Sequence, residues 1–590
     1  MTTMRLTALA VISLFTLFAC GKEEAQQPVS SSDNALLSYI PAASPYLAAN
    51  LEPTPNEVID SFLQKAEPVL LTAQAELVKL RARLENEPDA ADAGSKLALA
   101  ILQELDGKLN RPGLESLGFD LQSHKVFYAM DAFPVLRVSL SDAGALRSTV
   151  QRILERAGIA ATEQNFQGQA YWRLAADAAS GHYRAEVAGG LYFAILADHF
   201  ALSIFPTSAE SNLLPLFLGL QKPGDSDAGS RLKAVNALYG FSPYFTGLLD
   251  LQLLADEFLQ PDSLLASTMS AAGADSLATL SNECKSEFRQ IISHTPRLVA
   301  GTTELTPNAV GVQYIVETQP ELAQQLASLV ADVPMPEAVS TRMLEFAFGM
   351  KFGPVRDFLR EKVMAITRAP YQCERLQALN AGAADALIQL DKPAPPLVNN
   401  FRGLRLSLGR FSMAGSMPDV VEGLIAVHVE QPEMFLGMAQ MFLPDLSSLN
   451  LVKGNPPVQL PASLIPVPDT VAFAALSDNA IGVSFGAGEE SRLPAYLAQQ
   501  ATGDGTFLSL NYDTAAYLDF NQGIGKKWQH YAGESDDEDG VPGSHAEHEA
   551  VAREIAGAIQ QAYKTVAGRS QLSLRFTAQG LVIDSRMTFK

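Results

Sequence analysis

Leu191–Phe205 reads LYFAILADHFALSIF, and Val471–Phe485 reads VAFAALSDNAIGVSF. Each stretch has two apolar runs around a short polar turn, a pattern that predicts a tight β-hairpin. Aligned without a gap, the two stretches share five residues: Phe193, Ala194, Leu196, Asp198 and Phe205 in the first recur as Phe473, Ala474, Leu476, Asp478 and Phe485 in the second. A segment with the sequence Leu-Pro-x-aromatic follows each hairpin. We therefore expect an internal duplication built around these hairpins.

The segments that flank the hairpins recur in the same order, which strengthens this expectation. Residues 46–51 correspond to 344–352, 125–157 to 404–442, 244–250 to 507–513, 282–294 to 547–566, and 297–317 to 572–589. A helix is expected after residue 57, because apolar residues recur there at helical spacing. Its apolar face consists of Val58, Phe62, Leu63, Ala66, Val69, Leu70 and Leu77.

The pattern of strands and helices predicts an α+β fold. Strands that arrive as hairpins, with helices between the pairs, are typical of antiparallel sheets packed with helices. A doubly wound parallel sheet would instead show single buried strands alternating with helices. At 590 residues the chain is also longer than one hydrophobic core usually supports. We expect two tandem related domains at residues 36–320 and 341–590, joined by a proline-containing linker at 321–340.

The N-terminus has the features of a secretory signal. Arg5 is followed by a short apolar run, Leu6–Phe18, and then by Ala19 and Cys20. A run of this length is too short to span a bilayer comfortably and fits a removable signal peptide at residues 1–19. Residues 20–35 are mostly small or polar and predict a flexible tether. An ordinary signal with an incidental cysteine is the alternative.

The Ala19-Cys20 junction resembles the lipobox of bacterial lipoproteins. This resemblance implies cleavage before Cys20 and attachment of lipid to its thiol. Gly21, in place of an aspartate, implies the outer membrane, and we expect the body to face the periplasm. The body itself resembles large uncharacterised lipoproteins, and that resemblance implies no activity.

The net charge of the chain argues against some classes of binding partner. It has 43 basic and 65 acidic residues, for a net charge of −22. Nucleic acids are bound through lysine and arginine contacts to phosphates, so we expect no nucleic-acid partner. General adsorption to anionic lipid surfaces is disfavoured for the same reason. The expected partners are the membrane, through the lipid anchor, and an envelope protein or an apolar ligand.

Two cysteines remain if Cys20 carries lipid. In an oxidising compartment Cys284 and Cys373 are expected to form a disulfide. Two separate buried thiols are the alternative, and a metal site formed by two such distant cysteines is disfavoured.

One serine matches a catalytic motif. Gly482-Val483-Ser484-Phe485-Gly486 fits G-x-S-x-G, in which a nucleophilic serine lies on a strand-to-helix turn. However, the apolar alternation around Ser484 predicts a strand that continues through it, and the first hairpin has no serine in register. A serine hydrolase is therefore the alternative to a non-enzymatic binding or scaffold protein.

A second segment could bind a metal. Residues 534–539 are acidic apart from one serine, and His545, His548 and Glu549 follow. Histidines three residues apart near carboxylates can hold a divalent ion. A capped helix start preceded by a solvated acidic loop explains the same residues, so we expect no metal. No P-loop, dinucleotide fingerprint or haem motif occurs, and we expect no cofactor.

Overall fold

A computed structural model describes residues 34–86, 93–159, 163–175, 189–271, 279–337, 339–414, 417–442, 444–465, 467, 470–520 and 544–590. The chain forms two compact units. The first contains residues 1–314, 548–566 and 589–590, and the second contains residues 315–547 and 567–588. The units are described separately below. The predicted boundaries at 320 and 341 concern the sequence repeat and stay a prediction.

The sheet of the first unit is antiparallel. Its strands pair in the order β4-β5-β6-β7-β3-β2-β1-β8-β9-β10. The strands are β1 (Tyr46–Ala49), β2 (Lys125–Met130), β3 (Phe133–Ser139), β4 (Glu163–Phe166), β5 (Gln169–Ala175), β6 (Gly189–Ile195), β7 (His199–Pro206), β8 (Thr246–Asp250), β9 (Arg297–Thr306) and β10 (Ala309–Glu317). From Ile315 onward, β10 belongs to the second unit.

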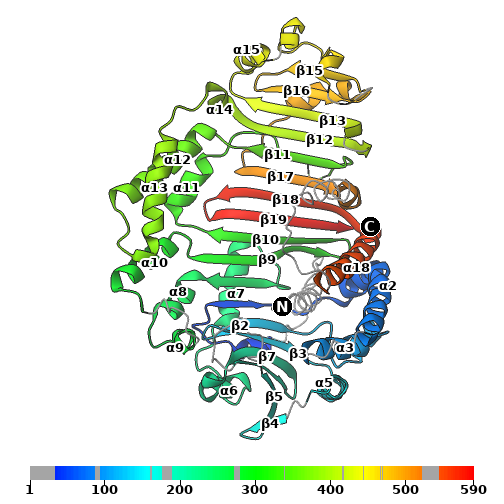
Figure 1. Cartoon of the computed structure of the whole chain (residues 1–590), viewed down its shortest axis with the longest axis vertical. Helices are drawn as coiled ribbons and strands as arrows, with labels where there is room; N and C mark the ends of the chain where they lie inside the picture. The colour runs from blue at the N-terminus through cyan, green and yellow to red at the C-terminus, as the bar shows by residue number, and fades with distance from the viewer. Residues whose placement is uncertain are drawn as a thin grey trace. The chain divides into compact units, whose positions relative to one another are not determined.

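The sheet of the second unit is antiparallel as well. Its strands pair in the order β14-β15-β16-β13-β12-β11-β17-β18-β19. The strands are β11 (Leu344–Gly349), β12 (Phe401–Ala414), β13 (Met417–Val429), β14 (Val458–Gln459), β15 (Ala472–Leu476), β16 (Ala480–Phe485), β17 (Thr506–Asp513), β18 (Ala567–Thr577) and β19 (Gly580–Phe589). The predicted α+β fold with antiparallel sheets is confirmed (Figure 1).

Strand order within each sheet supports the predicted duplication. The hairpin β6–β7 is followed in its sheet by β3, β2, β1 and β8. The hairpin β15–β16 is followed by β13, β12, β11 and β17, which are the corresponding strands of the second copy.

The hydrogen-bond register of the two hairpins differs from their alignment by identity. The Leu196 N–H donates to the His199 carbonyl, and the Ser477 N–H donates to the Ala480 carbonyl, each at 2.9 Å. His199 therefore corresponds to Ala480, whereas alignment by identity places it opposite Asn479. A one-residue slip moves every side chain to the other face of a strand. The five shared residues are thus not structurally equivalent, although the hairpins that contain them are.

Helices surround both sheets. Those with residues in the first unit are α2 (Asn56–Asn86), α3 (Ala93–Leu105), α4 (Arg111–Glu115), α5 (Ala143–Ala157), α6 (Glu210–Phe217), α7 (Ala228–Tyr239), α8 (Leu251–Leu259), α9 (Leu264–Ala271), α10 (Asn282–Ser293) and α18 (Ser544–Val566). Those of the second are α11 (Pro320–Ser328), α12 (Phe352–Arg368), α13 (Gln377–Leu390), α14 (Pro396–Asn400), α15 (Pro432–Phe442) and α16 (Leu493–Ala498). Short 3-10 turns include η1 (Ala35–Tyr39), η2 (Thr207–Ala209), η4 (Glu374–Leu376), η5 (Pro444–Ser448), η6 (Ala462–Leu464) and η7 (Glu489–Ser491).

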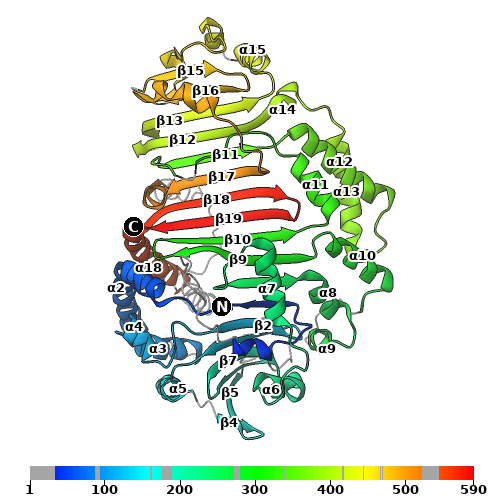
Figure 2. The ribbon, with the colours of Figure 1, turned by 180° about the vertical axis from the view of Figure 1, so that it is seen from behind.

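Helix α5 shows how local sequence sets these elements. The Asp142 carboxylate accepts hydrogen bonds from the backbone N–H groups of Gly144 and Ala145, so it caps the first turn. Gly158 ends the helix in the left-handed conformation at φ 63°, which glycine adopts without steric cost. Leu146 of α5 packs with Trp172 and other apolar residues of β5–β7. On the side of the sheet seen in Figure 2, α7 contacts β8.

Candidate functional site

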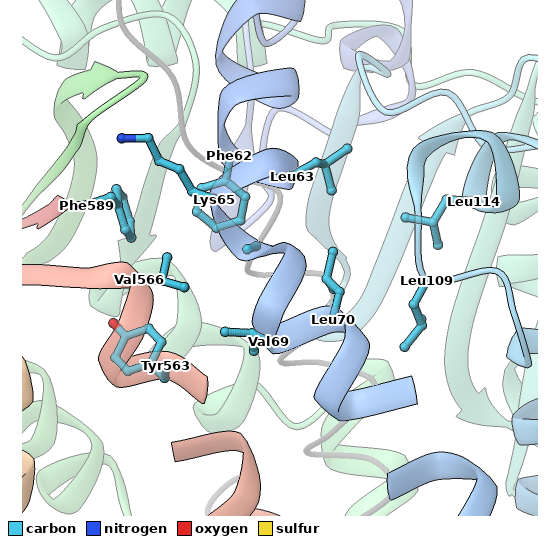
Figure 3. A pocket seen from close by; sticks show the side chains of 11 residues that line it. Phe62, Leu63, Lys65, Val69, Leu70, Leu109, Leu114, Tyr563, Val566 and Phe589 are labelled. Atoms are coloured by element: carbon cyan, nitrogen blue, oxygen red, sulfur yellow. The ribbon is translucent and has the colours of Figure 1, made fainter. Parts of the chain in front are cut away.

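The first unit contains an apolar pocket of about 100 Å³. Three parts of the chain that are far apart in sequence form it: helix α2, the segment around α4, and the end of α18 with Phe589 (Figure 3). Its lining residues are Phe62, Leu63, Lys65, Ala66, Val69, Leu70, Leu109, Leu114, Tyr563, Val566 and Phe589.

Helical periodicity explains the α2 wall of this pocket. Phe62, Ala66 and Val69 are spaced by four and three residues, so they share one side of the helix. The predicted apolar face of this helix is thus confirmed, with the pocket on one part of it. The ring of Phe62 meets that of Phe589, a residue of the same unit, edge to face, with centroids 5.5 Å apart.

Among the described residues that line the pocket, one, Lys65, is charged. The aliphatic stem of Lys65 contributes to the wall, and its Nζ donates a hydrogen bond to the Asn308 Oδ1 at 2.5 Å. The ammonium group thereby stays at the surface while the stem covers apolar side chains. An enclosed apolar cavity of about 150 Å³ in another protein binds benzene. This pocket therefore suits a small apolar group or the end of an apolar chain.

Ser484 is the fifth of the six residues of β16, so it lies on the strand and not on a turn. It pairs with Leu424 of β13 and Phe473 of β15, and α16 begins only at Leu493. The side chain is fully buried, and its Oγ has no hydrogen-bond partner among the described residues. The strand predicted to run through Ser484 is confirmed, so the geometry of a nucleophile elbow is absent at this serine.

No base stands next to Ser484 in the described part of β13. His428 pairs with Ala480, four residues from Ser484 along β16, or about 14 Å at the usual rise of an antiparallel strand. A general base must come within about 3 Å of the proton it removes. Ser203 of β7 pairs with Val135 of β3 as Ser484 pairs with Leu424, so the hairpin register gives Ser484 a counterpart that alignment by identity missed.

Cys284 and Cys373 form the predicted disulfide. Cys284 lies in the first turn of α10, where the Ser281 Oγ accepts a hydrogen bond from its backbone N–H. Cys373 directly precedes η4, and both side chains are buried. Cys20 and the tether up to residue 33 lie outside the described residues, so lipidation stays a prediction.

The metal-binding alternative is not tested by the structure. Residues 534–543 lie outside the described part of the chain, and the side chains of His545, His548 and Glu549 are not described. Among the residues whose positions are described, no group of three His, Cys, Asp or Glu side chains could hold a metal ion.

A buried arginine with several polar partners lies under the first hairpin. The Arg137 guanidinium donates to the Tyr128 hydroxyl at 3.0 Å and to the carbonyls of Leu216 and Phe217 at 3.1 and 2.9 Å. It also contacts the His199 Nε2 at 2.7 Å. Burial and the neighbouring Arg137 charge lower the pKa of His199, although Asp198 acts in the opposite direction. The N–H groups of the Arg137 guanidinium are thus hydrogen-bonded to other groups of the protein. We therefore assign this cluster a structural role and do not propose it as a binding site.

Comparison of the chain with protein-family models, with curated proteins and with solved structures gave no match. Within the described ranges, no helix is both long and apolar enough to cross a membrane. The pocket beside α2 is therefore the feature that says most about function.

Proposed function

We propose that this protein is a non-enzymatic lipoprotein of the bacterial outer membrane that faces the periplasm and binds an apolar component of the cell envelope. The pocket between α2, α4 and α18 is the observation that carries this proposal, because its walls are apolar side chains. The lipobox-like Ala19-Cys20 sequence supports the location. A purely scaffolding role is the alternative, and a serine hydrolase is disfavoured by the burial of Ser484 within strand β16.

The size of the pocket sets the expected affinity. One water occupies about 30 Å³ of liquid, so the cavity has room for about three groups of that size, such as methylenes. Burying a methylene contributes about 0.8 kcal/mol. Filling the cavity therefore contributes about 2 kcal/mol, which corresponds to about 30-fold in affinity.

Binding can be tested with a fluorescent fatty acid, cis-parinaric acid, and the secreted, unlipidated Cys20→Ala chain. We expect saturable binding that falls at least tenfold when Ala66→Trp fills the pocket from α2. Leu71→Trp is the matched control, because Leu71 is on the same helix, is 63% exposed and does not line the pocket. Ala66→Leu makes the same test with a smaller side chain if tryptophan prevents folding. Absence of binding by the parent chain, or equal binding by both tryptophan variants, would contradict an apolar ligand in this pocket.

The location can be tested separately by metabolic labelling with an alkyne-bearing palmitate. The full-length chain is expected to incorporate the label, and Cys20→Ala is expected to lose it. Equal labelling of the two chains would refute lipidation at Cys20 and leave the pocket experiment unaffected.

A further inference from the structure

A positive charge lies at one edge of the apolar pocket. Lys65 comes three residues after Phe62 and four before Val69, so its stem neighbours both of these side chains on the surface of α2. Figure 3 shows the Lys65 ammonium group on the side of Phe589 and away from Leu114, which lies at the other end of the pocket. A ligand that enters the pocket from this edge therefore meets the ammonium group first.

The turn between β9 and β10 holds the ammonium group in place. The Lys65 Nζ donates to the Asn308 Oδ1 at 2.5 Å. The Asn308 carbonyl accepts a hydrogen bond from the Phe589 N–H at 2.8 Å, and the Ser61 hydroxyl donates to the Pro307 carbonyl at 3.1 Å. The turn is thus tied both to α2 and to a residue of the pocket wall. The position of the charge is set before a ligand binds, which lowers the entropic cost of binding.

The Lys65 ammonium group can form further hydrogen bonds. A lysine ammonium has three N–H donors, and Asn308 accepts from one of them. Among the described residues, no carboxylate forms an ion pair with Lys65, although the chain has 65 acidic residues. The remaining donors and the positive charge are therefore free to bind an anionic group at the edge of the pocket.

The composition of the site favours one class of anion. One lysine balances the single charge of a carboxylate, whereas a phosphate monoester would bring a second negative charge to a chain whose net charge is −22. A cavity of about 100 Å³ takes part of one hydrocarbon chain, not the two chains of a phospholipid. A peptide terminus would bring backbone N–H and C=O groups that need partners, and the described lining residues with polar side chains are Lys65 and Tyr563 alone.

We propose that the pocket binds a fatty acid, with the carboxylate on Lys65 and the neighbouring methylenes between α2, α4 and the end of α18. This inference rests on the proposed function, which places an apolar ligand in the same pocket, and adds the charged group that selects the ligand. The carboxylate would accept hydrogen bonds from the Lys65 Nζ at the surface, so that its charge stays in contact with water while the hydrocarbon is buried.

The test compares decanoate with 1-decanol, which has the same chain length and no charge. Each displaces the uncharged fluorescent probe N-phenyl-1-naphthylamine from the secreted, unlipidated Cys20→Ala chain. Lys65→Met removes the charge and keeps most of the stem. We expect it to weaken decanoate binding about threefold or more and to leave decanol binding unchanged. Lys65→Arg, which keeps the charge, is expected to retain decanoate binding.

Lys79→Met is the matched control, because it removes the same charge from the same helix. The Lys79 side chain is 54% exposed, pairs with Glu76 at 2.6 Å and does not line the pocket. We expect this variant to bind decanoate like the parent chain. An equal effect of Lys65→Met and Lys79→Met on decanoate would trace the change to net charge and overturn the proposal.

The remaining outcomes separate this proposal from the proposed function. If both ligands displace the probe and Lys65→Met changes decanoate and decanol binding equally, the fatty-acid assignment fails and an apolar ligand stands. If neither ligand displaces the probe, or if Ala66→Trp leaves their binding unchanged, both proposals fail. Tighter binding of the acetylated peptide Ala-Ala-Leu than of decanoate would assign the site to a peptide terminus and overturn the fatty-acid proposal.

Discussion

Glu104 of α3 offers a quantitative test of how the first unit is held together. Its side chain is only 3% exposed and accepts hydrogen bonds from Lys108 Nζ at 2.6 Å, Arg152 Nη2 at 2.6 Å and Arg156 Nη1 at 2.8 Å. Burial alone would raise the pKa of Glu104, but hydrogen bonds from Arg152 and Lys108 outweigh it and lower the pKa to about 2. The carboxylate therefore ties α3 to α5 in its charged form.

The pKa of Glu104 gives the size of this contribution. A shift from 4.5 to about 2 corresponds to at most about 3.4 kcal/mol, at 1.36 kcal/mol per pKa unit. The side chains of Arg152 and Arg156 are 43 and 41% exposed, and solvent screens such charges, so we expect about 1.5–2 kcal/mol. Because the folded pKa lies below the unfolded one, this stability is present above about pH 4.5 and is lost as the pH falls toward 2.

The perturbation is Glu104→Gln, which keeps the shape of the side chain and removes its charge. Urea unfolding is followed by the fluorescence of Trp172, which packs against α5, in a Trp528→Phe background. We expect a loss of about 1.5–2 kcal/mol at pH 7 that shrinks steadily between pH 4.5 and the lowest pH at which the unit stays folded. Glu115→Gln, in an ion pair with Arg111 where Glu115 is 42% exposed, is the control and should cost under about 0.5 kcal/mol. An equal loss at pH 7 and pH 3 would show that packing, not charge, is responsible.

Three further predictions concern other buried groups. Cys284→Ser should lower the free energy of unfolding by at most about 4–5 kcal/mol, by the loop-entropy estimate, and reduction of the disulfide in the parent chain should have the same effect. Urea midpoints that stay unchanged would refute this prediction. Burial and the charge of Arg405 lower the pKa of His428 to about 4, so the second unit should lose up to about 3 kcal/mol of stability as the pH falls from 6.5 to 4. His428→Leu should abolish this pH dependence, and an equal acid sensitivity in the variant would contradict the prediction. Ser484→Ala should change the free energy of unfolding by about 1 kcal/mol or less, because its Oγ has no hydrogen-bond partner among the described residues, and a fluorophosphonate probe should label neither chain. Labelling of the parent chain alone would restore the hydrolase hypothesis.

Local sequence patterns were sufficient to predict individual strands and helices of this fold. The alternation in residues 481–485 predicted a strand through Ser484, and the helical spacing of apolar residues after residue 57 predicted α2. Both rest on interactions within a few residues, which the sequence displays directly. The disulfide between Cys284 and Cys373 followed from the expected compartment and the number of cysteines.

The strand register of the two hairpins and the contacts between distant segments could not be predicted from local sequence patterns. Alignment by identity shifted one hairpin by one residue relative to the structural alignment. It matched a shared aspartate and phenylalanine, whereas the hydrogen bonds at the turns, which set the register, are not visible in the sequence. The pocket could not be predicted from the sequence for a similar reason. The apolar face of α2 was visible in the sequence, but nothing linked it to Tyr563 and Phe589, about 500 residues away.

The buried arginines show what the two hairpins do have in common. Arg137 of β3 lies opposite Val126 of β2, whereas Arg405 of β12 lies opposite Ala426 of β13. The arginine therefore comes from the other strand of the pair in the second copy, where residue identity cannot detect it.

The two guanidinium groups nevertheless have one hydrogen-bonding role in common. Each donates to a carbonyl near the end of the short helix after the hairpin, Arg137 to Phe217 and Arg405 to Tyr496, at 2.9 Å in both cases. Each also lies over a tyrosine ring, although the tyrosines come from different elements: Tyr39 of η1 at 4.2 Å from Arg137, and Tyr496 of α16 at 4.0 Å from Arg405. Carbonyls at a helix end have no partner within the helix, and burying them without one is costly. Directly opposite residues on paired strands point to the same face, so a long arginine on either strand can supply the donor. The shared feature of the copies is thus a physical requirement of the hairpin and its helix, which supports duplication and assigns this region to the scaffold.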